Sequence, residues 1–304
     1  LCRSQVEKYA LRGRTVLEIG CGKGDFLVEL CELGDCHGIG IDPSYRPERI
    51  SSPAAARIRF LQELYSQRHA GLTADYVCCR HTLEHIAPVH EFVRTVRDTL
   101  AGHPDATVFF ELPDMERILL EQAFWDIYYE HCSYFTLGSL ARLFRRCDFA
   151  LLDLYKGFDG QYLMIESQPG AGSGARRFAA EEDLEKTAAQ VKVFREQIDR
   201  KFASFRRQME EIRAGSRTAV IWGSGSKAVS FLTSLQIGGE IEWIVDINPH
   251  KHGKFLAGSG HRIVAPAFLR EVRPDVVIVM NPIYCDEIRA DLAAMGLAPE
   301  VTAV

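Results

Sequence analysis

The chain has 304 residues, of which 47% are hydrophobic and 25% are charged, and its formal net charge is −5. This composition is typical of a soluble globular protein with two domains, and it excludes the basic surface of a nucleic-acid-binding protein. No apolar run reaches the roughly 18 residues that a membrane-spanning helix requires, so we expect no membrane partner.

Nine cysteines are scattered along the chain, and none forms a CxxC pair. These spacings favour free buried thiols in a reducing compartment and argue against a zinc site. We therefore expect a cytoplasmic protein without a bound metal.

The first predicted strand, residues 15–19, is apolar except for Glu18, and Gly20, Gly22 and Gly24 follow it at alternate positions. Glycine allows the turn to adopt positive φ and lets a ligand approach bare backbone. The helix that begins near Gly24 directs its free N–H groups and the positive end of its dipole to the same place. This arrangement predicts a pocket for a small polar or charged ligand at the carboxyl end of a strand.

The second predicted strand, residues 37–41, ends at Asp42, and Pro43 follows it. Asp42 stands about 20 residues beyond the glycine turn, the separation at which an acid accepts hydrogen bonds from ribose hydroxyls. The glycine spacing differs from that of the dinucleotide fingerprint. The alternative is a glycine-rich turn with a solvated aspartate, but the two features together favour a nucleotide-type cofactor.

The rest of the first domain alternates strands and helices. Strands are predicted at residues 58–61, 76–79, 107–111, 149–154 and 161–166, and helices at 115–123, as part of a lid, and 137–146, with Thr136 as N-cap.

A histidine-rich turn, residues 80–86, follows the fourth strand. The carboxyl ends of parallel strands line the ligand crevice of a doubly wound sheet, so we expect His81 and Leu83 beside the cofactor. Glu84 and His85 have two interpretations. They begin the next helix, whose N-terminus favours an acid, or they contact the cofactor.

An aromatic-rich segment, residues 124–135, carries Tyr128, Glu130 and His131. Histidine is both neutral and basic near pH 7, so His131 is a candidate general base. The alternative is an ordinary capping or core histidine beside an aromatic lid.

A glycine-rich linker, residues 168–174, precedes a long predicted helix, residues 178–213. Apolar residues recur every seven positions along this helix: Leu184, Val191, Ile198, Phe205 and Ile212. We favour packing along the chain's own two domains because the stripe is short. The alternative is the coiled coil of a homodimer.

A second, smaller Rossmann-like α/β fold is predicted from residue 218 onward. A glycine turn follows strand 218–222, and an aspartate follows strand 241–245. The strand, glycine turn and acid of the first domain are thus repeated at similar spacing. A further strand and a helix are predicted at 275–280 and 286–295. One cofactor does not need both crevices, which implies a second ligand. The alternative is a structural domain whose glycine turn is only a tight connection.

Three segments result from this organisation. The expected boundaries are residues 1–167 for the first domain, 168–214 for the linker and long helix, and 215–304 for the second domain.

The Glu-x-Gly-x-Gly-x-Gly pattern of residues 18–24 resembles motif I of the class I S-adenosylmethionine methyltransferases. The resemblance implies a Rossmann-like seven-stranded sheet closed by an antiparallel hairpin, with S-adenosylmethionine as the cofactor and S-adenosylhomocysteine as its product. The implied cofactor contacts are Glu18, Gly20, Gly22, Gly24, Asp42, Pro43, Gln62 near adenine, His81 and Leu83.

The run Tyr128-Tyr-Glu-His131, the Ser-Tyr-Phe of 133–135, and the stretches 222–228 and 245–254 resemble the sugar C-methyltransferase family. Members of that family act on nucleotide-linked keto-deoxysugars. The resemblance implies that His131 is the base, that Glu130 orients or polarises, and that Tyr128 hydrogen-bonds the sugar. It places the nucleotide-sugar near Gly223, Ser224, Ser226, Lys227 and Asp246.

The resemblance implies a C-methylation, in which a base forms an enolate and the enolate carbon attacks the methyl group. One alternative is O- or N-methylation of a glycan or small metabolite. Another is a non-catalytic nucleotide-binding module, against which the Tyr-x-Glu-His run argues because a pure binder needs no base.

Overall fold

The computed structural model describes residues 1–47, 52–170 and 176–304, and the chain divides into two compact units. The first unit contains Leu1–Arg117 and Tyr129–Gln190, and the second contains Ile118–Tyr128 and Val191–Val304. Each unit therefore combines two separate stretches of the sequence. Part of the predicted linker, residues 171–174, lies outside the described residues.

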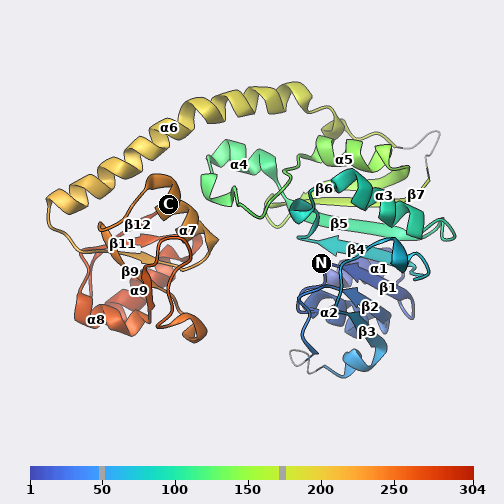
Figure 1. The fold of residues 1–304 in the computed structure, drawn as a ribbon, viewed down its shortest axis with the longest axis horizontal. Helices are drawn as coiled ribbons and strands as arrows, with labels where there is room; N and C mark the ends of the chain where they lie inside the picture. The colour runs from blue at the N-terminus through green and yellow to red at the C-terminus, as the bar shows by residue number, and fades with distance from the viewer. Residues whose placement is uncertain (48–51, 171–175) are drawn as a thin grey trace. The chain divides into compact units, whose positions relative to one another are not determined.

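A seven-stranded sheet forms the first unit, in the order β3-β2-β1-β4-β5-β7-β6 (Figure 1). Strands β1 to β5 pair in parallel, whereas β7 runs antiparallel to both β5 and β6. The predicted α/β fold with an antiparallel hairpin is confirmed. The strands are β1 (Thr15–Ile19), β2 (His37–Ile41), β3 (Ile58–Leu61), β4 (Tyr76–Arg80), β5 (Thr107–Pro113), β6 (Phe149–Gly157) and β7 (Tyr162–Pro169).

Strand β5 is longer than the sequence predicts. Its last two residues, Leu112 and Pro113, pair with Leu163 and Tyr162 of β7, so the ladder continues past residue 111, where the predicted strand ends. The strand ends at Pro113, and the next residue, Asp114, still donates its N–H to the Gln161 carbonyl at 3.1 Å.

Helices cover both faces of this sheet (Figure 1). Helices α1 and α2 contribute buried side chains to a core on one face, and α3 and α5 contribute to the core on the other. Thr136 caps α5 as predicted, because its side chain accepts a hydrogen bond from the Ser139 N–H at 3.2 Å. The helices are α1 (Cys2–Lys8), α2 (Asp25–Gly34), α3 (Val89–Thr99) and α5 (Leu137–Arg146), and the short 3-10 helices are η2 (Pro53–Arg57), η3 (Gln67–His69), η4 (Leu83–His85) and η6 (Ala179–Glu181).

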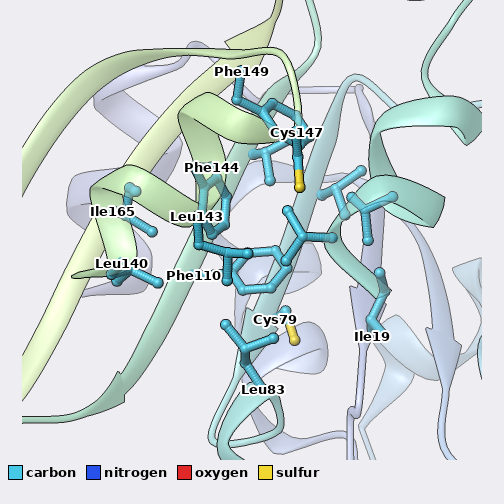
Figure 2. Close-up of a cluster of buried hydrophobic side chains, with 14 of the residues drawn as sticks. Ile19, Cys79, Leu83, Phe110, Leu140, Leu143, Phe144, Cys147, Phe149 and Ile165 are labelled. Carbon is cyan, nitrogen blue, oxygen red and sulfur yellow. The ribbon is translucent and has the colours of Figure 1, made fainter. Parts of the chain in front are cut away.

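The core beneath α3 and α5 fixes the carboxyl ends of the central strands (Figure 2). The ring of Phe110 from β5 meets that of Phe144 from α5 edge to face at 5.1 Å. Ile19, which precedes the glycine turn, and Leu83, which lies within the histidine-rich turn, are both buried in this cluster. Both turns are therefore anchored by side chains that pack in this core.

A five-stranded parallel sheet forms the second unit, in the order β10-β9-β8-β11-β12. The two edge strands, β10 and β12, are short and were not predicted from the sequence. The strands are β8 (Ala219–Trp222), β9 (Ile241–Val245), β10 (Arg262–Val264), β11 (Val276–Val279) and β12 (Glu300–Ala303).

Helices cover both faces of the second sheet as well. Helix α7 packs on one face together with the end of α6, and α8 and α9 pack on the other. The helices are α7 (Ser226–Leu235), α8 (Leu269–Val272) and α9 (Cys285–Ala294), and the short 3-10 helices are η7 (Pro249–Lys251), η8 (Pro266–Phe268) and η9 (Pro282–Tyr284). Among the described residues, no helix has the length and apolar character needed to cross a membrane.

The predicted apolar stripe lies on the long helix α6 (Leu184–Ala214). It is buried only along the C-terminal half of this helix. Met209 and Ile212 are buried in the second unit's core, with Ile198, Phe202 and Phe205 packed against it. Leu184 and Val191 are 65% and 47% exposed. Packing on the chain's own domain therefore explains three of the five stripe residues, Ile198, Phe205 and Ile212, and a homodimer stays a prediction.

Helix α4 (Met115–Glu121) and the turn η5 (Phe124–Asp126) carry the chain from the first unit into the second. Phe124 and Trp125 are buried in the second unit's core. The helix is confirmed, and its expected role in a lid stays a prediction.

Candidate active site

The glycine turn after β1 lines a cavity of about 1060 Å³, here called the first cavity. Gly20, Gly22 and Gly24 have positive φ angles of 74°, 53° and 86°. A Cβ atom on Gly20 would lie 1.9 Å from Oγ1 of Thr82, so glycine is required both for φ and for space.

Asp42 fixes the glycine turn from the end of the neighbouring strand. Its Oδ2 accepts a hydrogen bond from the Gly22 N–H at 2.8 Å, and its Oδ1 accepts from the Ser44 N–H and hydroxyl, each at 2.6 Å. A carboxylate offers about four acceptor positions, so Asp42 retains limited capacity for a ligand hydroxyl.

The predicted cofactor residues divide into those that line the first cavity and those that support it. Gly24 is the N-cap of α2, Gln62 donates to the carbonyl of Pro43 at 3.4 Å, and Glu18 and Leu83 are buried. Five line the cavity directly: Gly20, Gly22, Asp42, Pro43 and His81.

Sequence reasoning missed several side chains that line the first cavity: Tyr65, Arg80, Thr82 and Phe92. Two of them had a signal, because Arg80 and Thr82 flank the predicted His81. Tyr65 and Phe92 come from segments without a motif and reach the cavity only through the fold.

Glu18 is a buried carboxylate directly before the cavity-lining residues Ile19 and Gly20. It is 3% exposed, and its Oε2 has no hydrogen-bond partner among the described residues. Burial raises the pKa of Glu18 to about 8, although the charge of Arg80 opposes this shift. A buried carboxylate with one oxygen unpartnered is stabilised by a cation, so the residues present fit a cofactor that carries an ammonium group.

An ionic network around the buried Glu111 holds His81 in the wall of the first cavity. The Glu111 carboxylate accepts two hydrogen bonds from the Arg80 guanidinium, at 3.1 and 2.7 Å, and its Oε1 lies 2.8 Å from Nε2 of His81. Burial raises the pKa of Glu111, but the hydrogen bonds from His81 and Arg80 outweigh burial and lower it overall. His81 adopts a left-handed φ of 47°, which this network stabilises.

Three titratable side chains meet beside this wall: Glu84, His85 and His131. One donor atom from each lies within 4.8 Å of the others, and the two imidazole rings are 4.9 Å apart, edge to face. Glu84 and His85 belong to the turn η4, and α3 begins only at Val89, so they do not open the helix. His85 lines the first cavity, whereas Glu84 is buried.

Backbone hydrogen bonds bring His131 to this cluster. The carbonyl of Glu84 accepts from the N–H groups of Cys132 and Ser133, at 2.7 and 3.2 Å. Nδ1 of His85 donates to the carbonyl of Glu130 at 3.1 Å, while the Glu130 side chain is exposed. The loop that carries His131 is thus attached to the end of β4.

The second unit has a cavity of about 440 Å³, here called the second cavity, at the carboxyl ends of its central strands. In a sheet of this order, the crevice beyond these strand ends is where ligands bind. Aromatic and aliphatic side chains form much of its wall: Trp222, Val279, Met280, Tyr284 and Ile288. The predicted residues Gly223, Ser226, Lys227 and Asp246 also line it.

Ser224 does not line the second cavity and instead holds Asp246. Oδ2 of Asp246 accepts hydrogen bonds from the Ser224 N–H at 3.0 Å and from its hydroxyl, and Lys251 Nζ lies 3.2 Å away. Burial raises the pKa of Asp246, but the Ser224 hydrogen bonds and further donors outweigh it and lower the pKa to about 2. Asp246 is therefore a fixed negative charge at the glycine turn.

The unit boundary divides the predicted catalytic run. Tyr128 belongs to the second unit, lines the second cavity and donates a hydrogen bond to Asp126 at 3.2 Å. Glu130 and His131 belong to the first unit.

Two family models match the chain. A methyltransferase domain model matches residues 2–154, and a C-methyltransferase C-terminal domain model matches residues 167–298. Among curated proteins, the C-methyltransferase NovU of Streptomyces niveus is 28% identical over 300 residues, which covers 93% of this chain and 70% of that protein.

Solved structures match the chain over about half of its length. An O-methyltransferase family protein from Burkholderia thailandensis is 18% identical with a TM-score of 0.47, and the match covers 56% of this chain and 55% of that one. The 1,6-didemethyltoxoflavin-N1-methyltransferase of the same organism, solved with 1,6-didemethyltoxoflavin and S-adenosylhomocysteine bound, is 17% identical, with a TM-score of 0.41 and coverage of 56% and 76%.

Proposed function

The chain belongs to the methyltransferases, with a C-methyltransferase C-terminal domain after its methyltransferase domain, and we propose that it methylates a carbon atom of a nucleotide-linked keto-deoxysugar. The observation that carries this proposal is the second cavity. A methyltransferase for a small acceptor does not require a second sheet with its own cavity beside a glycine turn. The second cavity therefore supports a larger acceptor, part of which binds there.

The first cavity is the proposed cofactor site. Gly20 and Gly22 offer bare backbone, Asp42 offers an acceptor for a ribose hydroxyl, and Glu18 offers a carboxylate for an ammonium group. When bound there, S-adenosylmethionine supplies an electrophilic methyl group.

The second cavity is the proposed site of the nucleotide. Its volume of about 440 Å³ falls within the roughly 300–1,000 Å³ of small-molecule sites. Trp222 and Tyr284 offer apolar surface for a base, Lys227 offers a positive charge for a diphosphate, and Tyr128 offers a hydroxyl to the sugar.

His131 is the proposed general base. A carbon next to a ketone becomes nucleophilic when its proton is removed, and a neutral imidazole accepts that proton near pH 7. Such general-base assistance contributes roughly 10²–10⁴-fold to the rate. Glu130, with its exposed carboxylate, is proposed to orient or polarise the acceptor, and Tyr128 to stabilise the developing oxyanion.

Solvent deuterium exchange tests the proposal without requiring turnover. In D₂O without S-adenosylmethionine, the protein should exchange the proton next to the ketone of a nucleotide-linked ketosugar. His131→Asn should abolish exchange and methyl transfer while the affinity for S-adenosylhomocysteine is unchanged. The matched control is His37→Asn, which should keep full activity. His37 is exposed and begins β2, at the end of the strand away from Asp42 and the first cavity.

Two results would count against the assignment. Full activity of His131→Asn would show that another group is the base. Methyl transfer to a hydroxyl or amine, with no exchange at carbon, would favour O- or N-methylation of a glycan or small metabolite.

A further inference from the structure

A buried carboxylate that the mechanism above does not use lies beside the proposed base. Glu84 is 3% exposed, and its Oε2 accepts no hydrogen bond from the described parts of the chain. Burying such an oxygen is unfavourable unless it meets a charge or a donor, so its position in the site requires an explanation.

The geometry links this carboxylate to His131. Donor atoms of Glu84, His85 and His131 all lie within 4.8 Å of one another. The Cys132 and Ser133 N–H groups that bind the Glu84 carbonyl keep the loop of His131 in register with η4. The imidazole is therefore held close to the Glu84 side chain by the backbone of the same residue.

Other titratable groups face this cluster from the neighbouring elements. Nδ1 of His81 lies 3.8 Å from Oε1 of Glu84, Glu111 lies beyond His81, and the Tyr134 ring is 5.8 Å from that of His131. Burial raises the pKa of Glu84 overall, and a backbone hydrogen bond and the charges of His81 and His85 only partly oppose this shift. A positive charge on a nearby imidazole thus favours the ionised carboxylate.

Glu130 is the other carboxylate near the base, and its environment is different. Its side chain is exposed, and its contact with His85 is made through the backbone carbonyl. Water and salt screen the field of an exposed carboxylate far more than that of a buried one.

We propose that Glu84, and not Glu130, is the carboxylate that stabilises the imidazolium formed when His131 accepts the acceptor's proton. The proposal rests on the proposed function. The C–H electron pair stays on the acceptor as the enolate, the proton moves to the imidazole, and Glu84 keeps its negative charge. Glu84 is thus a positioning residue that acts through His131.

Histidine titration by NMR tests this coupling without any acceptor. The C2–H resonance of His131, assigned by its loss in His131→Asn, is titrated in metal-free buffer in wild type, Glu84→Gln and Glu130→Gln. Removal of a carboxylate within about 4–6 Å should lower the midpoint by about one pH unit in Glu84→Gln. Glu130→Gln should lower it by less. An unchanged midpoint in Glu84→Gln, or a larger shift in Glu130→Gln, would overturn the proposal.

Kinetics provide the second readout. In Glu84→Gln, the acid limb of the kcat/KM profile should move to lower pH and the plateau should fall about 10-fold, with KM unchanged. Glu84→Asp, which keeps the charge, should restore most of the plateau rate and most of the position of the acid limb. A lower rate without movement of the limb would indicate a structural role and sink the proposal. Because the NMR experiment needs no acceptor, an incorrect acceptor assignment would leave its result intact.

Discussion

At the scale of single residues, both sheets use the same device to build a ligand cavity. An aspartate at the end of the second strand accepts a hydrogen bond from the glycine turn after the first strand. Asp42 accepts from Gly22 at 2.8 Å, and Asp246 accepts from Ser224 at 3.0 Å. Because most acceptor positions of Asp42 are already occupied, we expect specificity to depend also on other residues near each cavity, such as Glu18.

The buried carboxyl group of Glu18 leads to a prediction about proton release on ligand binding. Its pKa of about 8 means that the ligand-free protein carries a protonated Glu18 at pH 7. An ammonium group beside it favours the ionised form, so binding of S-adenosylhomocysteine at pH 7 should release close to one proton from this residue. Calorimetric titrations in buffers with different ionisation enthalpies measure this release.

The matched variant for that experiment is Glu18→Gln, which keeps the shape and cannot release a proton. It should bind more weakly and without the pH-dependent release. Equal proton release by the variant and the wild type would contradict the prediction. In the ligand-free protein, the same raised pKa predicts that stability falls as pH rises from about 4.5 towards 8, since ionising Glu18 is unfavourable only in the folded state.

At the scale of elements, helix α6 shows how one amphipathic pattern is used in two ways. Its C-terminal half buries Met209 and Ile212 against the second sheet, while Val191 in its N-terminal half is 47% exposed. A helix of this length is stabilised mainly by the packing of its apolar face, so the two halves should contribute unequally to stability.

Ile212→Ala should therefore lower the free energy of unfolding by about 2–4 kcal/mol through the cavity it leaves, as measured by urea denaturation. The control Val191→Ala should change it by no more than about 0.5 kcal/mol. A large effect of Val191→Ala, together with a change in sedimentation, would show instead that the exposed half is covered by a second copy of the chain.

At the scale of the whole molecule, the two units share the chain in an interleaved order. Residues 118–128 leave the first unit and contribute Phe124 and Trp125 to the core of the second. The Trp125 ring also lies 4.3 Å from Nζ of Lys201 on α6. The second core is therefore incomplete when built from the C-terminal stretch alone.

Trp125→Ala tests this interleaving. The substitution should destabilise the second unit by about 3–5 kcal/mol, as expected for loss of a buried aromatic side chain. Thermal unfolding followed with and without S-adenosylhomocysteine should show that only the transition insensitive to this ligand moves. Leu120→Ala, at a position 59% exposed on the same segment, is the control and should leave both transitions in place. If the ligand-sensitive transition moved equally, the assignment of the segment to the second unit would be wrong.

The sequence by itself determined the parts of this protein that depend on local chemistry. Gly20 and Gly22 need positive φ, Asp42 and Asp246 end buried strands, and Thr136 caps a helix. Each of these is decided within a few neighbouring residues. Alternating apolar strands and helices likewise indicated both α/β sheets, without the edge strands β10 and β12 of the second. The resemblance to class I methyltransferases added the hairpin of the first.

Only the tertiary structure decided how distant segments meet. It placed Leu83 in the core, assigned Phe124 and Trp125 to the second unit, and brought the Glu84 carbonyl to the Cys132 and Ser133 N–H groups. Tyr65 and Phe92 reach the first cavity in the same way. None of these contacts has a local signal, because burial and long-range hydrogen bonding depend on the packing of the whole chain and not on the residues beside each position.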